Sequence, residues 1–169
     1  LDINGREGNK EKFSGSAGIG ILTSRLTLEG PIVKNKTSLL LSGRTTYSDW
    51  IMKKLPEKSG YNHGNAGFYD LAATLSHTFS QNDNLVLNGY YSHDRFSLQG
   101  DEKYGYTNTN ASLKWRHIFQ PKLTASFSAG YDHYDYETYT VENDVNAYRL
   151  AFDINQWYGK LDFTSYLAD

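Results

Sequence analysis

The chain has 169 residues, enough for one domain with its own core. Its net charge of -2, its pI near 6.2 and its lack of any basic run argue against a nucleic-acid partner. The absence of cysteine excludes disulfides, thiol catalysis and cysteine-based zinc sites. No stretch reaches the roughly 18 apolar residues of a membrane-spanning helix, but a closed β-barrel also satisfies its backbone within a membrane.

Apolar and polar residues alternate with period two along most of the chain, which predicts strands with one apolar and one polar face. A tight reversal near Gly20 is expected between the first two strands. The predicted strands cover 12–21, 22–29, 37–48, 69–79, 85–94, a run ending at Phe119, 123–133, 148–154 and 161–167. Short turns are predicted near 31–36, 81–84, 120–122 and 156–159, and long connections near 49–67, 97–105 and 136–146.

The pattern is clearest over 111–119, where Ala111, Leu113, Trp115, His117 and Phe119 share one face and polar residues, most of them charged, share the other. The alternating runs span roughly ten or more residues, close to the roughly 9–11 of a tilted membrane strand. Strands of soluble proteins usually span only about 5–6 residues. We therefore expect a membrane barrel, with a soluble β-sandwich as the alternative.

Aromatic side chains collect at both ends of the predicted strands, as expected for the two interfaces of a lipid-facing wall. A mean hydropathy of -0.63 beside 15% aromatic residues also fits a barrel with a polar interior. The band predicted at the short-turn end contains His77, Phe79, Trp115, His117, Phe119, Trp157 and Tyr158. The band predicted at the long-loop end contains Tyr47, Trp50, Tyr91, His93, Tyr131, His133 and Tyr148.

Two segments, Ser24–Ile32 and Lys36–Trp50, resemble the first barrel hairpin of TonB-dependent outer-membrane receptors, in particular the large type with a carboxypeptidase-like regulatory domain. The resemblance implies that Leu1–Asn9 is the last plug strand with its link, and that Gly30-Pro31-Ile32 is the first periplasmic turn. It divides the chain into a plug end and linker, 1–11, and the N-terminal part of a barrel, 12–169.

This resemblance implies an all-β fold: an antiparallel transmembrane β-barrel segment of about nine strands, taken from a barrel of twenty-two, with short periplasmic turns and long extracellular loops. The chain begins at Leu1 without Met or an apolar leader, so we expect a fragment with a signal peptide upstream. The implied partners are outer-membrane lipid, the TonB complex through missing N-terminal parts, and a surface lipoprotein.

The resemblance further implies active uptake of a nutrient, an iron chelate, a cobamide or a glycan, in the outer membrane of a Gram-negative bacterium. Two alternatives remain open. One is a small structural or adhesion barrel of the outer membrane, and the other is a soluble β-sandwich that binds carbohydrate. All three assign the chain no enzymatic activity.

The residues suggest no catalytic, metal or cofactor site. Four of the five histidines fall at outward strand ends, and no pair has ligand spacing, so an interfacial role is favoured over a metal site. The acidic pairs Asp132/Asp135 and Glu142/Asp144 indicate a solvated surface, because no calcium loop of twelve residues surrounds them.

Ligand-binding candidates are aromatic and histidine residues of the predicted loops, since flat rings stack on sugars and planar chelates. They are Trp50, Tyr61, His63, Tyr104, Tyr106, Tyr136 and Tyr139. A second set carries charges predicted to face a lumen, where they pair with one another or bind a plug. This set is Arg44, Asp94, Lys114, Arg116, Asp132, Arg149, Asp153 and Asp162.

Overall fold

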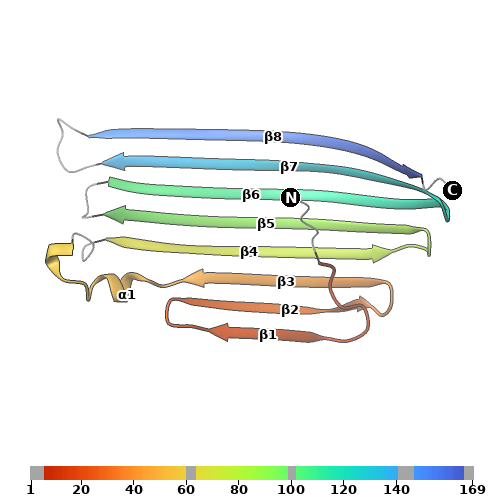
Figure 1. The fold of residues 1–169 in the computed structure, drawn as a ribbon, viewed down its shortest axis with the longest axis horizontal. Coiled ribbons are helices and arrows are strands. Elements are labelled where there is room, and N and C mark those ends of the chain that lie inside the picture. Colours follow the sequence, from red (N-terminus) through yellow and green to blue (C-terminus); the bar gives the residue numbers. More distant parts are fainter. Residues whose placement is uncertain (1–5, 60–63, 99–101, 141–146, 166–169) are drawn as a thin grey trace.

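The computed structural model describes residues 6–59, 64–98, 102–140 and 147–165, which form one antiparallel sheet of eight strands (Figure 1). Each strand pairs with the next along the chain, and the sheet is not closed, because β1 and β8 do not pair with each other. The strands are β1 (Ser14–Ile19), β2 (Thr23–Val33), β3 (Thr37–Thr46), β4 (Asn65–Thr78), β5 (Asp83–Leu98), β6 (Glu102–Gln120), β7 (Leu123–Thr140) and β8 (Tyr148–Ser165). A short helix α1 (Asp49–Met52) and a 3-10 turn η1 (Glu57–Ser59) lie between β3 and β4.

The two ends of the sheet differ in their connections (Figure 1). At the turn end, residues 34–36, 79–82 and 121–122 join successive strands, and Asn35 adopts the left-handed conformation that asparagine tolerates in turns. At the opposite end, here named the loop end, lie the tight β1–β2 reversal over 20–22 and the connection that holds α1.

The cross-strand register gives the sheet two chemically different faces. One face, the apolar face, carries Leu75, Leu87 and Leu113 side by side, with Trp115 and Phe127 in the adjacent row. The opposite face, the polar face, carries the residues between them. Its rows include Thr74, Asn88 and Ser112, and beyond them Lys114, Ser128 and Lys160.

Several predicted boundaries are wrong, because pairing with a neighbouring strand extends strands through residues that favour turns. The predicted turn at 156–159 lies within β8, where Gln156 and Gly159 pair with Asp132 and Ala129. Most of the predicted loop 97–105 belongs to β5 and β6, and 136–140 belongs to β7. Gly30-Pro31-Ile32 lies in β2, so the turn begins only after Val33. The described residues therefore contain eight strands, not nine.

Two bands of aromatic rings cross the apolar face, as predicted, but Trp157 changes band, and Tyr148 and Tyr158 lie on the polar face. His77 and Phe79 lie near the turn end with their centroids 4.4 Å apart, as do His117 and Phe119 at 4.5 Å. Tyr131 and Trp157 lie 4.5 Å apart in the other band, because β8 is continuous. Trp157 therefore belongs to the band near the loop end, and its predicted place in the turn-end band is wrong.

The distribution of buried and exposed side chains is the reverse of that in a soluble globular protein. Among the described residues, Leu40 is the single buried hydrophobic side chain, while Ser38 and Ser76 are fully buried and hydrogen-bonded to each other at 2.9 Å. On the apolar face, by contrast, Leu71 is 56% exposed and Trp157 is 78% exposed. No helix within the described ranges has the length and apolar character needed to cross a membrane.

The segment before β1 lies across the polar face near the turn end. Glu7 accepts hydrogen bonds from Asn84 and from Lys10, whose ammonium also donates to Thr78. Burial raises the pKa of the Glu7 carboxyl, but the hydrogen bonds from Lys10 and Asn84 outweigh it and leave that pKa below its ordinary value. Gly8 is buried against the backbone of Leu39 and Leu40. These contacts dock the segment on β3, β4 and β5.

The close approach of Gly8 predicts the effect of adding a methyl group there. A Cβ at this position would lie 2.8 Å from the Leu39 carbonyl oxygen, a backbone atom that cannot move aside. We expect Gly8→Ala to destabilise the docked segment by about 1–3 kcal/mol, measured as increased hydrogen exchange of residues 6–12. Gly105→Ala is the matched control, because nothing lies within 4 Å of a Cβ there. Equal exchange in the two variants would contradict the docking.

Candidate functional site

A surface of six aromatic rings lies on the polar face near the loop end, contributed by β4 to β8. The register aligns Phe68, Tyr106, Tyr136 and Phe152 in one row, and Phe96 and Tyr104 in the next row outward. We name these six residues the aromatic wall. Tyr106 and Tyr136 lie 5.0 Å apart, and Tyr136 and Phe152 lie 5.9 Å apart and stack at 18°. Such pairs hold one another in place and leave ring surface for a ligand.

A pocket of about 280 Å³ adjoins the aromatic wall on the side toward the middle of the sheet. Side-chain amides and a carboxylate dominate its lining, together with two tyrosines and an isoleucine. Asn110 donates to Asp132 at 2.5 Å, and Asn108 donates to Ser92 at 3.2 Å. The polar-face lining residues are Tyr90, Asn108, Asn110, Asp132, Tyr134, Ile154 and Gln156. We name this the amide pocket.

A carboxylate organises the outer edge of the wall. Glu102 accepts hydrogen bonds from the hydroxyls of Tyr104 and Tyr148. The bond from Tyr104, with that from Tyr148, holds the pKa of the Glu102 carboxyl below its usual value. In return, the hydrogen bond that Tyr104 donates to the Glu102 carboxylate, together with burial and the nearby negative charge, raises the pKa of Tyr104 to about 12. Both phenols therefore remain neutral donors near neutral pH.

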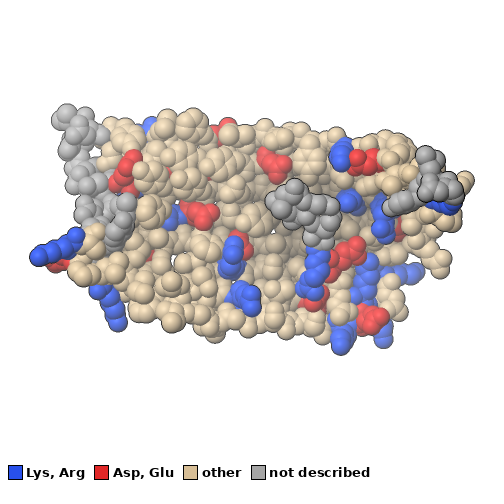
Figure 2. Space-filling model, viewed as in Figure 1, with Lys and Arg blue, Asp and Glu red and all other residues tan. Residues whose placement is uncertain are grey.

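Together the wall and the pocket suit a particular ligand chemistry. Flat rings offer apolar stacking surface, and the neighbouring amides offer both donors and acceptors. Figure 2 views the side on which the N-terminal segment lies, and its charged side chains gather toward the turn end. Charges also lie toward the loop end of this face, among them Asp94 in the row of the aromatic wall and Asp132 in the amide pocket. A ring-bearing molecule with many hydroxyl groups and little charge fits this arrangement best.

Three predicted ligand-binding residues, Tyr104, Tyr106 and Tyr136, belong to the aromatic wall. Tyr139 lies on the opposite face, where the Lys103 ammonium sits 5.6 Å from its ring centroid. Trp50 lies in α1 and donates to the Ile21 carbonyl at 3.3 Å, so its indole nitrogen is directed to the β1–β2 reversal. Tyr61 and His63 lie outside the described residues.

Six of the eight charges predicted to face a lumen share the polar face. The other two, Arg149 and Asp153, lie on the apolar face beyond its aromatic band, because β8 keeps one register from Tyr148 to Ser165. Four of the eight have an ion-pair or hydrogen-bond partner named below, and none of these partners belongs to the predicted set. Arg44 pairs with Asp70 at 2.7 Å, Asp132 accepts from Asn110, Arg149 pairs with Glu137 at 2.6 Å, and Asp162 pairs with Lys160 at 2.9 Å. Asp94, Lys114 and Arg116 occupy polar-face rows beside Tyr106, Ser128 and Ser126.

Several residues of the site were not predicted: the phenylalanines of the wall, and Asn108, Asn110 and Gln156 of the pocket. A signal for them exists in the sequence. Tyr104 and Tyr106 continue the alternation of Asn108, Asn110 and Ser112 without a break. Extending that alternation through the predicted loop 97–105 would have placed the tyrosines and the amides on one face.

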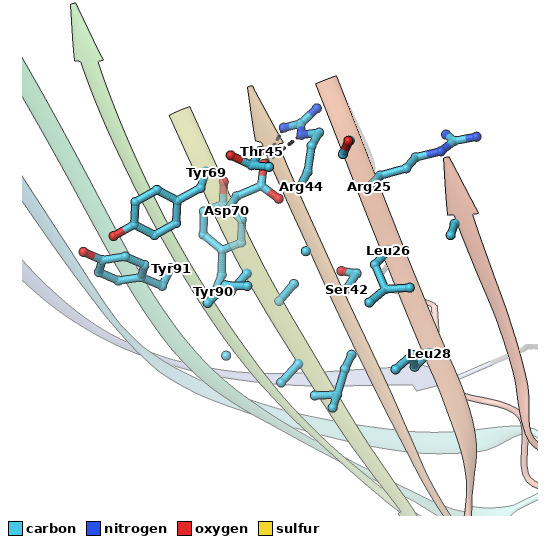
Figure 3. Close-up of a pocket in the computed structure, with 18 of the residues that line it drawn as sticks. Arg25, Leu26, Leu28, Ser42, Arg44, Thr45, Tyr69, Asp70, Tyr90 and Tyr91 are labelled. Atoms are coloured by element: carbon cyan, nitrogen blue, oxygen red, sulfur yellow. Dashed lines mark hydrogen bonds and ion pairs between the residues drawn. The ribbon is translucent and has the colours of Figure 1, made fainter. Parts of the chain in front are cut away.

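The apolar face also has an open hollow of about 1000 Å³, over β1 to β6 (Figure 3). Tyr69 and Tyr91 lie together on one side of it, 5.9 Å apart, and Leu26 and Leu28 lie on the other. It arises because small residues, among them Gly43, Ala73 and Gly89, stand between larger ones in these rows. The hollow is an open depression in an apolar surface and does not form an enclosed binding site.

A comparison of the chain with protein-family models, with curated proteins and with solved structures finds no match.

The contact between Glu102 and Tyr104 predicts a specific titration. We expect Glu102→Gln to lower the pKa of Tyr104 from about 12 toward its ordinary value of 10.0, because the neighbouring negative charge is removed. NMR of the tyrosine ring carbons follows the titration of each phenol separately. Glu137→Gln, which removes a carboxylate from the opposite face, serves as the control and should leave Tyr104 unchanged. A Tyr104 titration that is the same in Glu102→Gln and the unchanged protein would show that the two side chains do not interact.

Proposed function

We propose that this chain forms part of the wall of a TonB-dependent transporter in the outer membrane of a Gram-negative bacterium. Its apolar face contacts lipid and its polar face lines the lumen. The inverted burial carries the proposal: leucines and tryptophans are exposed on the apolar face, while serines and threonines are buried on the other. A barrel wall in a membrane needs this arrangement, because its outer face is surrounded by the hydrocarbon chains of the lipids.

The height of the apolar band supports the same proposal. The band runs from the row of His117 to the row of Tyr91 and Thr109, which are separated by eight residue steps along β6. Eight steps of an antiparallel strand span about 27 Å, and tilting the strand by roughly 40° reduces the height to about 20 Å, against roughly 25 Å for the apolar band of outer-membrane barrels. Toward the loop end the same face becomes charged, with Arg95, Glu137 and Arg149, as is suitable outside the hydrocarbon.

The open edges favour a piece of a larger barrel over a complete small one. β1 and β8 each leave a row of backbone groups without a strand partner, which is costly in lipid. Further strands of the same protein would pair with them. A soluble sandwich would instead need a second sheet over the apolar face, and the described residues form a single sheet.

The docked segment over 6–12 supports the transporter over a structural barrel. It lies on the polar face, which is the lumen side in this proposal, and it leads directly into β1. In TonB-dependent receptors, which the sequence resembles, the plug occupies the lumen and its last strand leads into the barrel. Glu7 and Lys10 would hold this link against the wall.

Among an iron chelate, a cobamide and a glycan, the site favours a glycan. Amides at Asn108, Asn110 and Gln156 suit hydroxyl groups, and the adjoining rings suit the flat faces of sugars. The carboxylates on this part of the face, Asp94 and Asp132, disfavour negatively charged chelates.

The three tryptophans predict a pattern of fluorescence quenching in lipid vesicles. Trp115 and Trp157 lie on the apolar face, 43% and 78% exposed, whereas Trp50 lies in α1 at the loop end. In single-tryptophan variants of the intact protein, brominated lipid should quench Trp115 and Trp157 and leave Trp50 unaffected. Iodide in the aqueous phase should show the opposite order. Efficient iodide quenching of Trp157 in vesicles would contradict the proposal that the apolar face contacts lipid.

Ligand binding should depend on the polar face alone. We expect Tyr136→Ala and Asp132→Asn to weaken oligosaccharide binding by the intact protein about tenfold or more, since each removes a central contact. Tyr139→Ala, on the opposite face of the same strand, is the control and should bind as the unchanged protein does. Isothermal titration calorimetry against a panel of oligosaccharides measures the affinity of the variants and of the control.

Uptake of the bound sugar should also cease in cells without TonB, and uptake that continues there would contradict the transport proposal.

A further inference from the structure

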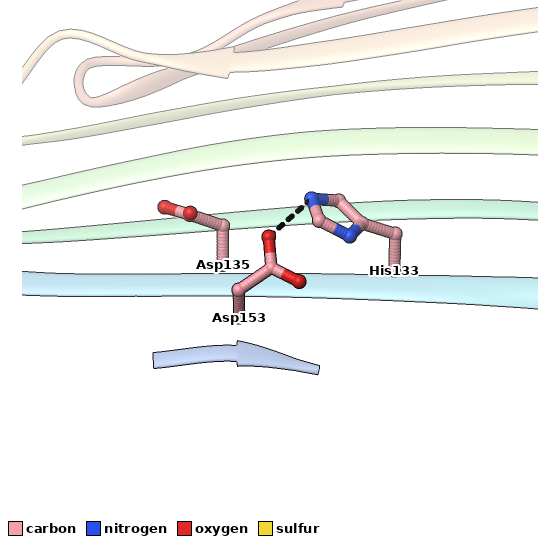
Figure 4. A group of neighbouring side chains, drawn as sticks. All are labelled: His133, Asp135 and Asp153. Atoms are coloured by element: carbon pink, nitrogen blue, oxygen red, sulfur yellow. Dashed lines mark ion pairs between the residues drawn. The ribbon is translucent and has the colours of Figure 1, made fainter. Parts of the chain in front are cut away.

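Three potential metal ligands meet on the apolar face of β7 and β8, between its aromatic band and the loop end: His133, Asp135 and Asp153 (Figure 4). His133 and Asp135 are two residues apart in β7, so their side chains leave the strand on one side. Asp153 is the cross-strand partner of Asp135. One nitrogen or oxygen of each residue lies within 4.8 Å of those of the other two.

A fourth residue, Asn155, determines which imidazole nitrogen is free. Its Nδ2 donates to the Asp153 carboxylate, which can only accept, so its Oδ1 must point the other way. That Oδ1 lies 2.9 Å from Nδ1 of His133 and also accepts from the Tyr131 hydroxyl. An amide oxygen has no proton to give, so Nδ1 of His133 carries the hydrogen and donates it.

With the hydrogen on Nδ1, the neutral form of the imidazole presents the lone pair of Nε2 to the cluster. This nitrogen lies 3.8 Å from Oδ2 of Asp153, the contact drawn as a dashed line in Figure 4, and an oxygen of Asp135 lies within 4.8 Å of both ligand atoms. In the neutral form of the ring, both atoms of that contact are acceptors. Three electron-rich groups face one gap, and a cation between them would turn repulsion into attraction. Metal-binding histidines characteristically have this arrangement, with the second ring nitrogen donating to an oxygen that orients the ring.

We propose that His133, Asp135 and Asp153 bind a divalent transition-metal ion, of which Zn²⁺ is the best fit. Zn²⁺ takes an imidazole nitrogen and carboxylate oxygens at about 2.0–2.2 Å, so tetrahedral ligand atoms stand about 3.4 Å apart. Closing the present separations to that value requires small side-chain rotations and no change in the strands. The fourth position stays open to water, and Asn155 is a positioning residue that holds the ring.

The site is independent of the proposed transport function, because it lies on the face opposite the aromatic wall and the amide pocket. Its neighbours explain why a cation is favourable there. Tyr131 and Trp157, in contact at 4.5 Å, border the cluster on the side of the apolar band. Two carboxylates close to each other repel, and a bound cation offsets that repulsion.

Calorimetry of the intact purified protein with Zn²⁺ tests the site, and Co²⁺ provides a visible absorption spectrum that reports the ligands. We expect one ion per chain, with affinity reduced about tenfold or more in His133→Gln and in Asp153→Asn. His93→Gln and Asp162→Asn are matched controls. His93 lies on the same face and contacts Thr107, and Asp162 lies on the same strand and pairs with Lys160. Both should bind Zn²⁺ as the unchanged protein does.

Three outcomes would overturn the proposal: no saturable Zn²⁺ binding by the unchanged protein, equal losses in the control and ligand variants, or binding of Ca²⁺ alone, which would exclude the imidazole as a ligand. If a ligand variant does not fold, the Co²⁺ spectrum of the unchanged protein still decides. Imidazole and carboxylate ligands in a tetrahedral site give an intense visible band, whereas a spectrum like that of hydrated Co²⁺ would refute the site.

Discussion

Backbone pairing between consecutive strands is the constraint on which this structure depends. Because every described strand pairs with its neighbours along the chain, one register runs from β1 to β8, and it assigns each side chain to a face. A slip of one residue in any pair would exchange the two faces of all strands beyond it. The leucine rows, the aromatic wall and the His133 cluster all require that this does not occur.

The two faces meet different demands along their length. In the middle of the sheet the apolar face carries leucines, and the polar face carries serine, threonine and asparagine, with Ser38 and Ser76 buried against each other. Near the loop end this distribution reverses, since the polar face carries Phe68, Tyr106 and Tyr136 while the apolar face carries Arg95, Glu137 and Arg149. The proposed function explains the reversal. Within the hydrocarbon the outer face must be apolar, and beyond it the rings are available for a ligand.

The proposed metal site and ligand site illustrate the same geometric principle on opposite faces. Each combines residues two apart on one strand with their partners on the next, as Tyr106 does with Tyr136, and Asp135 with Asp153. A sheet thereby builds a site from two strands, as for the metal ligands, or from five, as for the aromatic wall, without any loop. The strands position these side chains more rigidly than a loop would, because each is held by ladder hydrogen bonds on one or both sides.

The sequence by itself determined the strand-rich fold, the two-faced character of the sheet and most of the strand positions, because alternation with period two depends only on local side-chain direction. It also indicated Tyr104, Tyr106 and Tyr136. It misplaced Arg149, Asp153 and Trp157, because Gln156 and Gly159 favour turns locally, while pairing with β7 keeps β8 straight through them. The juxtapositions of Phe152 with Tyr136, and of Asp153 with His133, were decided by the tertiary structure alone. They depend on the register between strands. Many ladder hydrogen bonds set that register together, so no single segment of the chain determines it.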